Sequence, residues 1–151
     1  DGGSQWSLDD VWAPFITGNA PISISNSVFY GPYFTQPTHA EPLHVGDYGN
    51  GYRFTNVAFL QQSGPLDNTG ITATINFHGL DSIFDGCWFV WENPAQPPAY
   101  ITAYLDAGSG SIVRNSKFSS GPAGYVYSAS TYNPTFQNNT DVDTGAPVTG
   151  P

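Results

Sequence analysis

Four phenylalanines divide the chain at a nearly constant interval, and each ends a similar phrase of apolar and polar residues. They are Phe29, Phe59, Phe89 and Phe118, which recur after about 30 residues each time. Two further columns repeat at the same interval upstream: Ala13, Leu43, Ala73 and Ala103 form one, and Phe15, Val45, Ile75 and Leu105 form the other. Apolar residues two positions apart have the period of a β-strand and not of a helix. The pattern therefore predicts an all-β chain built from four repeats.

The repeats also predict how the chain is organised. They cover residues 13–123 of a single domain at 1–151, between an N-terminal cap at 1–12 and a C-terminal cap and tail at 124–151. Short strands joined by turns rich in glycine and proline make up each unit. A unit of about 30 residues cannot bury its own apolar face, so neighbouring units are expected to stack into a solenoid. A β-sandwich of antiparallel hairpins is the alternative fold.

The phrase that ends in each phenylalanine reads apolar, any, Asn, small, any, Phe. Its third position holds Asn26, Asn56, Gly86 and Asn115. Both residue types tolerate the left-handed backbone that a tight bend between two strands requires. Alternation then directs the small position and the phenylalanine inward, and it directs the intervening column outward: Val28, Ala58, Trp88 and Lys117.

This phrase resembles the right-handed parallel β-helix of the pectin-lyase-like superfamily, which includes phage tailspikes. The resemblance covers roughly residues 13–120 and implies a stacked ladder of Asn26, Asn56 and Asn115 beside the phenylalanines. It also implies a homotrimer on a virion surface or in an extracellular setting. Four rungs spaced by ~4.8 Å would extend about 20 Å, which is shorter than the long grooves of the polysaccharide enzymes in this superfamily.

The charge balance excludes several classes of partner. Three Lys or Arg residues face twelve Asp or Glu residues, which gives a net charge of −9. Three cations cannot neutralise the roughly 6–10 phosphates of a DNA site, so we expect no nucleic-acid partner and no anionic membrane partner. Only 10% of the residues are charged and 15% are aromatic, a composition compatible with a rigid extracellular β-protein.

Candidate chemistry is sparse along the chain. Asp85 and Arg114 share one column and are expected to form a cross-strand ion pair on a solvated face. Neither His44 nor His78 has a serine or carboxylate partner at the repeat spacing, and Cys87 falls in an inward column as an inert thiol. We therefore expect no catalytic residue, no metal site and no cofactor, and the balance favours a protein that is not an enzyme.

Aromatic residues at outward or corner positions are the strongest surface signal. The candidates for a binding surface or subunit interface are Trp88, Trp91, Tyr30, Tyr33, Phe34 and Tyr104. The favoured hypothesis is a non-catalytic structural protein of a virion surface, a capsid decoration or cement protein or a tailspike segment, that forms a trimer and contacts a capsid or tail protein. The alternatives are a fragment of a polysaccharide-degrading tailspike, lyase or glycosidase, and a carbohydrate-binding module whose rings stack on a glycan.

Overall fold

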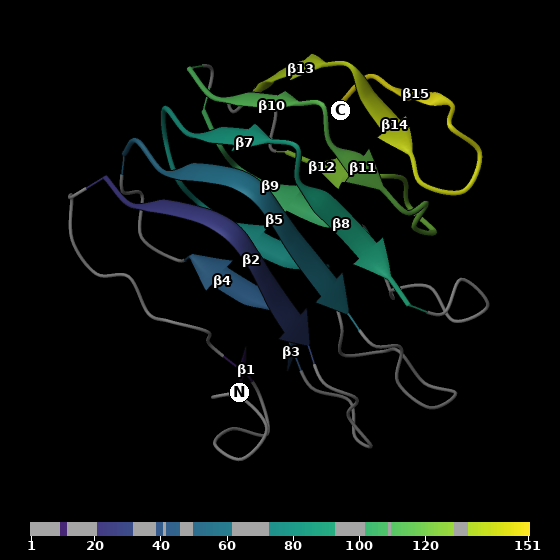
Figure 1. The fold of residues 1–151 in the computed structure, drawn as a ribbon, viewed down its shortest axis with the longest axis horizontal. Helices are drawn as coiled ribbons and strands as arrows, with labels where there is room; N and C mark the ends of the chain where they lie inside the picture. Colours follow the sequence, from purple (N-terminus) through teal and green to yellow (C-terminus); the bar gives the residue numbers. More distant parts are fainter. Residues whose placement is uncertain are drawn as a thin grey trace.

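The computed structural model of the chain describes residues 10–11, 21–31, 39–40, 42–45, 50–61, 73–92, 102–108, 110–128 and 133–151. This part of the chain is all-β, with fifteen strands and no helix (Figure 1). The strands form a nine-stranded, a four-stranded and a two-stranded sheet, and every strand pair is parallel except β14–β15. The hairpin pairing that the β-sandwich alternative requires is therefore limited, among these strands, to one pair.

Two long strands form the base of the nine-stranded sheet. They are β2 (Ser23–Gly31) and β5 (Arg53–Gln61). Beyond β5 the sheet divides into two arms. The first arm contains β7 (Ile83–Asp85), β10 (Ile112–Arg114) and β13 (Thr135–Gln137). The second contains β8 (Trp88–Trp91), β11 (Lys117–Phe118), β14 (Asn139–Asp141) and β15 (Pro147–Val148).

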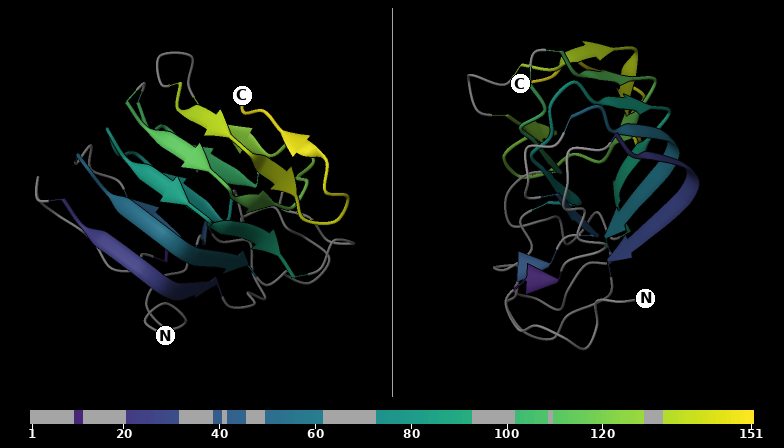
Figure 2. Two further views of the ribbon diagram at one scale, coloured as in Figure 1. Left: turned by 45° about the horizontal axis from the view of Figure 1, so that its top comes forward. Right: turned by 90° about the vertical axis from the view of Figure 1, so that its left-hand side faces the viewer.

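The four-stranded sheet lies opposite the nine-stranded sheet, and the chain returns to it once in each repeat (Figure 2). Its strands are β4 (Leu43–Val45), β6 (Ile75–Phe77), β9 (Ala103–Leu105) and β12 (Val126–Tyr127). The two-stranded sheet pairs β1 (Asp10–Val11) with β3 (His39–Ala40). The apolar core fills the space between the two larger sheets, where Phe54 of β5 meets Phe77 of β6 edge to face.

A left-handed residue marks the bend between the two arms in every repeat. The backbone φ angles are 50° at Asn26, 53° at Asn56, 65° at Gly86 and 52° at Asn115. The amide of Asn56 donates to Oδ1 of Asn26 over 2.8 Å, so the side chains of adjacent bends are linked. Asn138 adds a fifth bend with φ of 53°, which the sequence pattern missed because it follows Asn115 after less than one full repeat.

The repeating phenylalanines lie in register and stack along the inside of the nine-stranded sheet, from β2 through β5 and β8 to β11. Strand pairing aligns Phe29 with Phe59, Phe59 with Phe89, and Phe89 with Phe118. Their ring centroids are separated by 5.5, 5.2 and 4.6 Å in that order, with nearly parallel planes. Offset stacking of this kind stabilises each pair by about 0.5–1.5 kcal/mol beyond the burial of its apolar area.

A buried polar column runs beside the phenylalanines. The hydroxyl of Ser116 accepts a hydrogen bond from the backbone N–H of Cys87 and donates to the carbonyl of Arg114. Asn139 continues the column, because its Oδ1 accepts from the N–H of Ser116 and its amide donates to the carbonyl of Val113. These side chains therefore satisfy backbone groups that would otherwise be buried without partners.

The expected columns of the four-stranded sheet place the residues of β6 two positions too early, so both steps that involve β6 are wrong by two residues. The sequence aligned Leu43 with Ala73, but the structure pairs Leu43 with Ile75 and Val45 with Phe77. A shift of two residues keeps every side chain on the same side of the sheet, so the apolar alternation cannot detect it. The inward direction of these positions was predicted correctly, whereas their neighbours across the strands were not.

Candidate interaction surface

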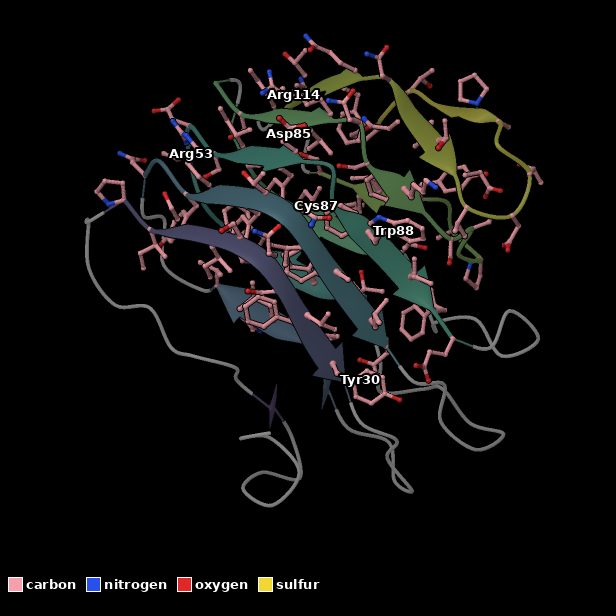
Figure 3. All side chains as sticks on the ribbon, viewed as in Figure 1. Tyr30, Arg53, Asp85, Cys87, Trp88 and Arg114 are labelled. Carbon is pink, nitrogen blue, oxygen red and sulfur yellow. The ribbon has the colours of Figure 1, made fainter. Side chains whose placement is uncertain are left out.

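All three large apolar side chains that are strongly exposed in the described part of the chain lie on the outer side of the nine-stranded sheet, on β2 and β8. Val28 is 63% exposed, Tyr30 is 47% exposed and Trp88 is 39% exposed. Val28 and Tyr30 belong to β2 and Trp88 belongs to β8, with β5 between them. Figure 3 shows Tyr30 and Trp88 on the same side of the nine-stranded sheet.

Strand register completes this surface with three half-buried apolar residues. Ala58 lies between Val28 and Trp88, and Leu60 lies between Tyr30 and the half-buried Val90. We call the set the outer apolar face, and its members are Val28, Tyr30, Ala58, Leu60, Trp88 and Val90. Every one of them alternates along its strand with a residue that faces the core or the opposite sheet, so the same pleat that buries the phenylalanines produces this face.

Two charged residues border the outer apolar face, and an aromatic ring engages each of them. The ammonium group of Lys117 lies 4.3 Å from the ring centroid of Trp88, a cation–π contact. The hydroxyl of Tyr30 donates a 2.9 Å hydrogen bond to Oε2 of Glu92, and this hydrogen bond raises the pKa of Tyr30. The centre of the face is thus apolar, and its charges lie at two separate corners.

Of the other predicted surface aromatics, Trp91 has a described side chain, and it does not join this face. Trp91 is buried, with 4% exposure, because it lies two residues after the inward Phe89 and therefore points the same way. Its expected role as an exposed aromatic is wrong. Tyr33 and Phe34 lie outside the described residues. Tyr104 lies in β9 on the opposite sheet, and its side chain is outside the described part.

Asp85 and Arg114 form the cross-strand ion pair that their column predicts. Nε and Nη2 of Arg114 donate to Oδ2 of Asp85 over 2.8 and 2.6 Å, and the amide of Asn115 donates to Oδ1 over 2.9 Å. The Arg114 and Asn115 hydrogen bonds lower the pKa of Asp85. Gly86 has no side chain that could accept a hydrogen bond from the next asparagine, Asn115. The carboxylate of Asp85 accepts it instead, so the ion pair continues the hydrogen-bonded ladder of the bends.

A histidine and carboxylate cluster that the sequence analysis missed lies on the four-stranded sheet. Nδ1 of His78 is 3.3 Å from Oδ2 of the buried Asp106, and the ring centroids of His44 and His78 are 6.4 Å apart. The parallel backbone pairing of β6 and β9 continues beyond the ends of both strands. It places His78 beside Asp106, although less than one full repeat separates the two residues in the sequence. The expectation that His78 has no carboxylate partner is wrong, because it assumed a constant repeat length.

Stability should depend on pH through His78. Burial lowers the pKa of this imidazole below 6.5, against a smaller opposing effect of Asp106. As the pH falls, the imidazole is protonated at a higher pH in the unfolded chain than in the folded chain. The free energy of unfolding should therefore fall as the pH drops from about 7.5 towards 5.5. Urea unfolding of the wild type and of His78→Asn at several pH values measures this, and an equal slope in both proteins over that interval would contradict it.

Cys87 occupies the inward position that its column predicts. It is fully buried, and burial raises the pKa of its thiol to about 12. Because the thiolate is the reactive form, native Cys87 should react with Ellman's reagent at pH 8 at least about 100-fold more slowly than in urea. Absorbance of the released thiolate follows the reaction. Comparable rates in buffer and in urea would contradict the assigned burial.

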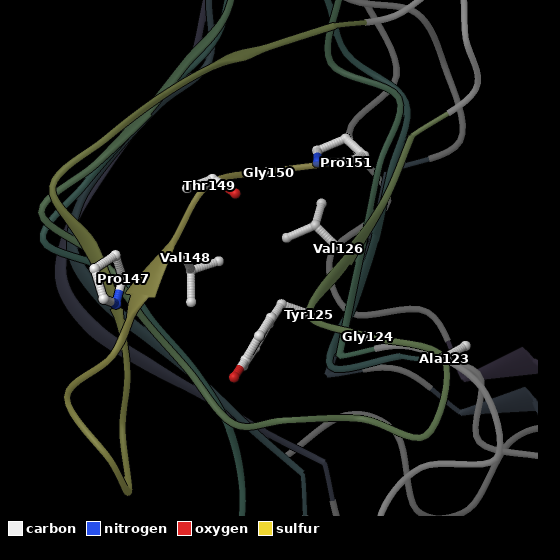
Figure 4. Close-up of a pocket in the computed structure, with 9 residues that line it drawn as sticks. All are labelled: Ala123, Gly124, Tyr125, Val126, Pro147, Val148, Thr149, Gly150 and Pro151. Carbon is white, nitrogen blue, oxygen red and sulfur yellow. The ribbon is translucent and has the colours of Figure 1, made fainter.

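A hollow of about 300 Å³ lies near the C-terminal strand, between the segments around β12 and β15 (Figure 4). Its lining includes Tyr125, Val126, Pro147, Val148 and Pro151. The nearby carboxylate of Asp141 is already engaged, because its Oδ1 accepts hydrogen bonds from the N–H and hydroxyl of Thr144. The lining of this hollow brings together no charged side chains, so it is a weaker candidate than the outer apolar face.

Neither a metal centre nor a membrane-spanning helix was found among the described residues. No group of three or more His, Cys, Asp or Glu side chains in this part of the chain is arranged to hold a metal ion. No described helix is long and apolar enough to cross a bilayer. No protein-family model, curated protein or solved structure matches the chain.

Proposed function

We propose that this chain is a non-catalytic structural protein that assembles with copies of itself through the outer apolar face. The observation that carries the proposal is the grouping of Val28, Tyr30 and Trp88, the strongly exposed large apolar residues of the described chain, on one side of one sheet. Subunit interfaces are enriched in Trp and Tyr and depleted of charge at their centres. The outer apolar face has both properties.

The scaffold we propose is a right-handed parallel β-helix of about four rungs. Three observations support it: parallel pairing, alternation of the chain between two facing sheets, and a left-handed residue at each bend between arms. Its handedness, its trimeric assembly and its place on a virion or other extracellular surface rest on the resemblance to phage tailspikes. A capsid or tail protein would then be the partner of the assembled oligomer.

Carbohydrate binding is the competing use of the same aromatics. Sugar rings stack on an open aromatic face, but the Lys117 ammonium already lies 4.3 Å from the centre of the Trp88 ring. The hydroxyl of Tyr30 is likewise engaged by Glu92. Both contacts favour a protein interface, because they place the charges at the rim and leave the apolar centre to be covered.

Light scattering of the purified chain at several concentrations tests the proposed function. The wild type should have a mass above 16.2 kDa that rises with concentration, and Trp88→Ala should shift the equilibrium towards the monomer. Thr135→Ala, at an exposed position on the first arm, is the control and should leave the mass unchanged. Monomers of both the wild type and Trp88→Ala at every concentration would overturn the proposal, and a glycan array would then test the sugar alternative.

A further inference from the structure

We propose that the free edge of β2 pairs antiparallel with β2 of a second copy of the chain, about a two-fold axis that is perpendicular to the sheet at the bend of Asn26. This inference goes beyond the proposed function, because it uses an edge of the nine-stranded sheet and not the outer apolar face. It adds a second contact between copies, which the resemblance to tailspikes does not imply.

Strand β2 has one edge that is open to a further strand. It pairs with β5 along its other edge, and no described strand lies beyond it in the nine-stranded sheet (Figure 1). Its nine residues include no charged residue and no proline. Natural sheets protect an edge with lysine, proline or a short strand, and an edge without these devices is a template for strand pairing.

The core is also incompletely covered beside this edge. Ile24 and Phe29 point inward from β2, and both side chains are half-buried. The residues aligned with them in the following strands are no more than 1% exposed: Phe54, Phe84, Val113, Phe59, Phe89 and Phe118. A strand added beyond β2 would cover the remaining apolar surface of Ile24 and Phe29.

The pairing with β5 shows which backbone groups face the free edge. In a parallel pair, alternate residues direct their N–H and C=O groups to one side. The carbonyl of Ile22 accepts from the N–H of Arg53, so Ile24 also faces β5. Beyond the bend, Phe29 faces β5, because the aligned Phe89 directs its carbonyl to the N–H of Ser119 in the next strand. The residues that face the free edge are therefore Ser23, Ser25, Val28 and Tyr30.

The bend at Asn26 determines which partner fits this edge. The open positions are two, three and two residues apart, because the left-handed Asn26 lies between Ser25 and Val28. A regular strand presents its N–H and C=O groups on one side at every second residue, so it matches one half of β2 only. The order of the spacings is the same in both directions. A second β2 that runs antiparallel therefore matches the whole edge.

A two-fold axis between Asn26 and Ser27 gives the register of this contact. Ser25 of one copy then lies opposite Val28 of the other, and the two remaining open positions lie opposite each other in the same way. Each pair exchanges two backbone hydrogen bonds. The carbonyl of Ser25 also accepts from the hydroxyl of Ser27 in its own strand, and its second lone pair remains for the ladder.

The same register brings the half-buried core residues together. Ile24 of one copy lies beside Phe29 of the other, and both point to the core side because the axis is perpendicular to the sheet. Each chain carries a net charge of −9, but β2 is uncharged, so the paired strands place no like charges opposite each other. Both β2 edges are used in the contact, so this pairing ends at two copies.

Proline at position 25 tests the ladder. The N–H of Ser25 faces the free edge, so Ser25→Pro keeps the pairing with β5 and removes one donor from each of two symmetric residue pairs. It should raise the dissociation constant of the dimer at least about tenfold, whereas Ser25→Ala keeps the N–H and should stay within about threefold. Both variants are made in the Trp88→Ala protein, in which the outer apolar face is weakened. Sedimentation velocity from about 1 to 500 μM measures the constants, and circular dichroism confirms folding.

Cysteine cross-linking tests the register without the proline variant. A mixture of Ser25→Cys and Val28→Cys chains should form disulfide-linked heterodimers on mild oxidation, because hydrogen-bonded partners have Cα atoms about 5.5 Å apart, within reach of a disulfide. A mixture of Ser23→Cys and Val28→Cys is the matched control, and its offset of two residues should lower the yield at least about tenfold. The native Cys87 is fully buried. A mass tag on one chain identifies heterodimers in non-reducing electrophoresis.

The possible results separate this inference from the proposed function. A Trp88→Ala dimer that Ser25→Pro dissociates, with cross-links in the predicted register, supports the β2 pairing. Equal dissociation constants for Ser25→Pro and Ser25→Ala, equal yields from the two cysteine mixtures, or a Trp88→Ala protein that is monomeric at every concentration each overturn it. The proposed function survives these three results if the wild type still assembles and Trp88→Ala weakens that assembly. A wild type that is monomeric at every concentration overturns both.

Discussion

Replacing Phe89 by alanine should lower the free energy of unfolding by about 3–5 kcal/mol, the usual cost of removing a fully buried aromatic ring. Phe89 has no exposed surface, and its ring stacks on Phe59 at 5.2 Å on one side and on Phe118 at 4.6 Å on the other. The substitution removes two stacked pairs and leaves a cavity in the middle of the ladder. Urea denaturation followed by circular dichroism measures the loss.

Two control variants set the scale for the loss of stability expected from Phe89→Ala. Phe89→Leu keeps much of the buried volume and should cost clearly less than alanine. Val28→Ala removes methyl groups from a side chain that is 63% exposed, so its effect should stay within about 0.5 kcal/mol. If Phe89→Ala were no more destabilising than Val28→Ala, the stacked ladder would not be part of the core.

Asn139→Ala should also be strongly destabilising, by about 2–5 kcal/mol. Asn139 is buried, and its side chain satisfies both the N–H of Ser116 and the carbonyl of Val113. Alanine would leave both backbone groups buried without a partner, at a cost of about 1–3 kcal/mol each. Thermal and urea unfolding of the purified variant measure the change.

The neighbouring Thr140 provides the control for this prediction. It lies in the same strand, points to the other side of the sheet and is half-buried. Thr140→Ala should therefore change stability by less than about 1 kcal/mol. Equal losses for Asn139→Ala and Thr140→Ala would show that the two hydrogen bonds of Asn139 contribute little.

The register of β2, β5 and β8 could be predicted from the sequence because the repeats that contain these strands have one length. Phe29, Phe59 and Phe89 are evenly spaced, and the same interval aligns Asn26 with Asn56 at the bends. A constant period converts sequence distance directly into strand register. The ion pair between Asp85 and Arg114 followed from the same alignment.

The four-stranded sheet could not be predicted with this accuracy, because its register depends on the lengths of the connections between strands. The step from Val45 to Phe77 is longer than the repeat length of the phenylalanines, and the step from Phe77 to Leu105 is shorter. Apolar alternation is unchanged by a shift of two residues, so it carries no information about such a slip. The contact of His78 with Asp106 was missed for this reason.

Trp91 was assigned to the surface because it stands at a corner of its repeat, close to the outward Trp88. Counting in twos from the inward Phe89 places it in the core, where the structure has it at 4% exposure. The same count correctly placed Trp88 outside. In this chain the parity of a position was a better guide to exposure than the tendency of tryptophan to mark binding sites.

Strand β15 forms one edge of the nine-stranded sheet and determines whether a further strand can pair there. It runs antiparallel to β14, and the N–H of Asp141 bonds to the carbonyl of Ala146, so position 147 directs its nitrogen away from β14. That position is Pro147, which has no N–H to donate. A further strand that paired with β15 would find no backbone N–H donor at position 147. We therefore expect copies of the protein to associate through their other surfaces and not to form fibrils by adding strands at this edge.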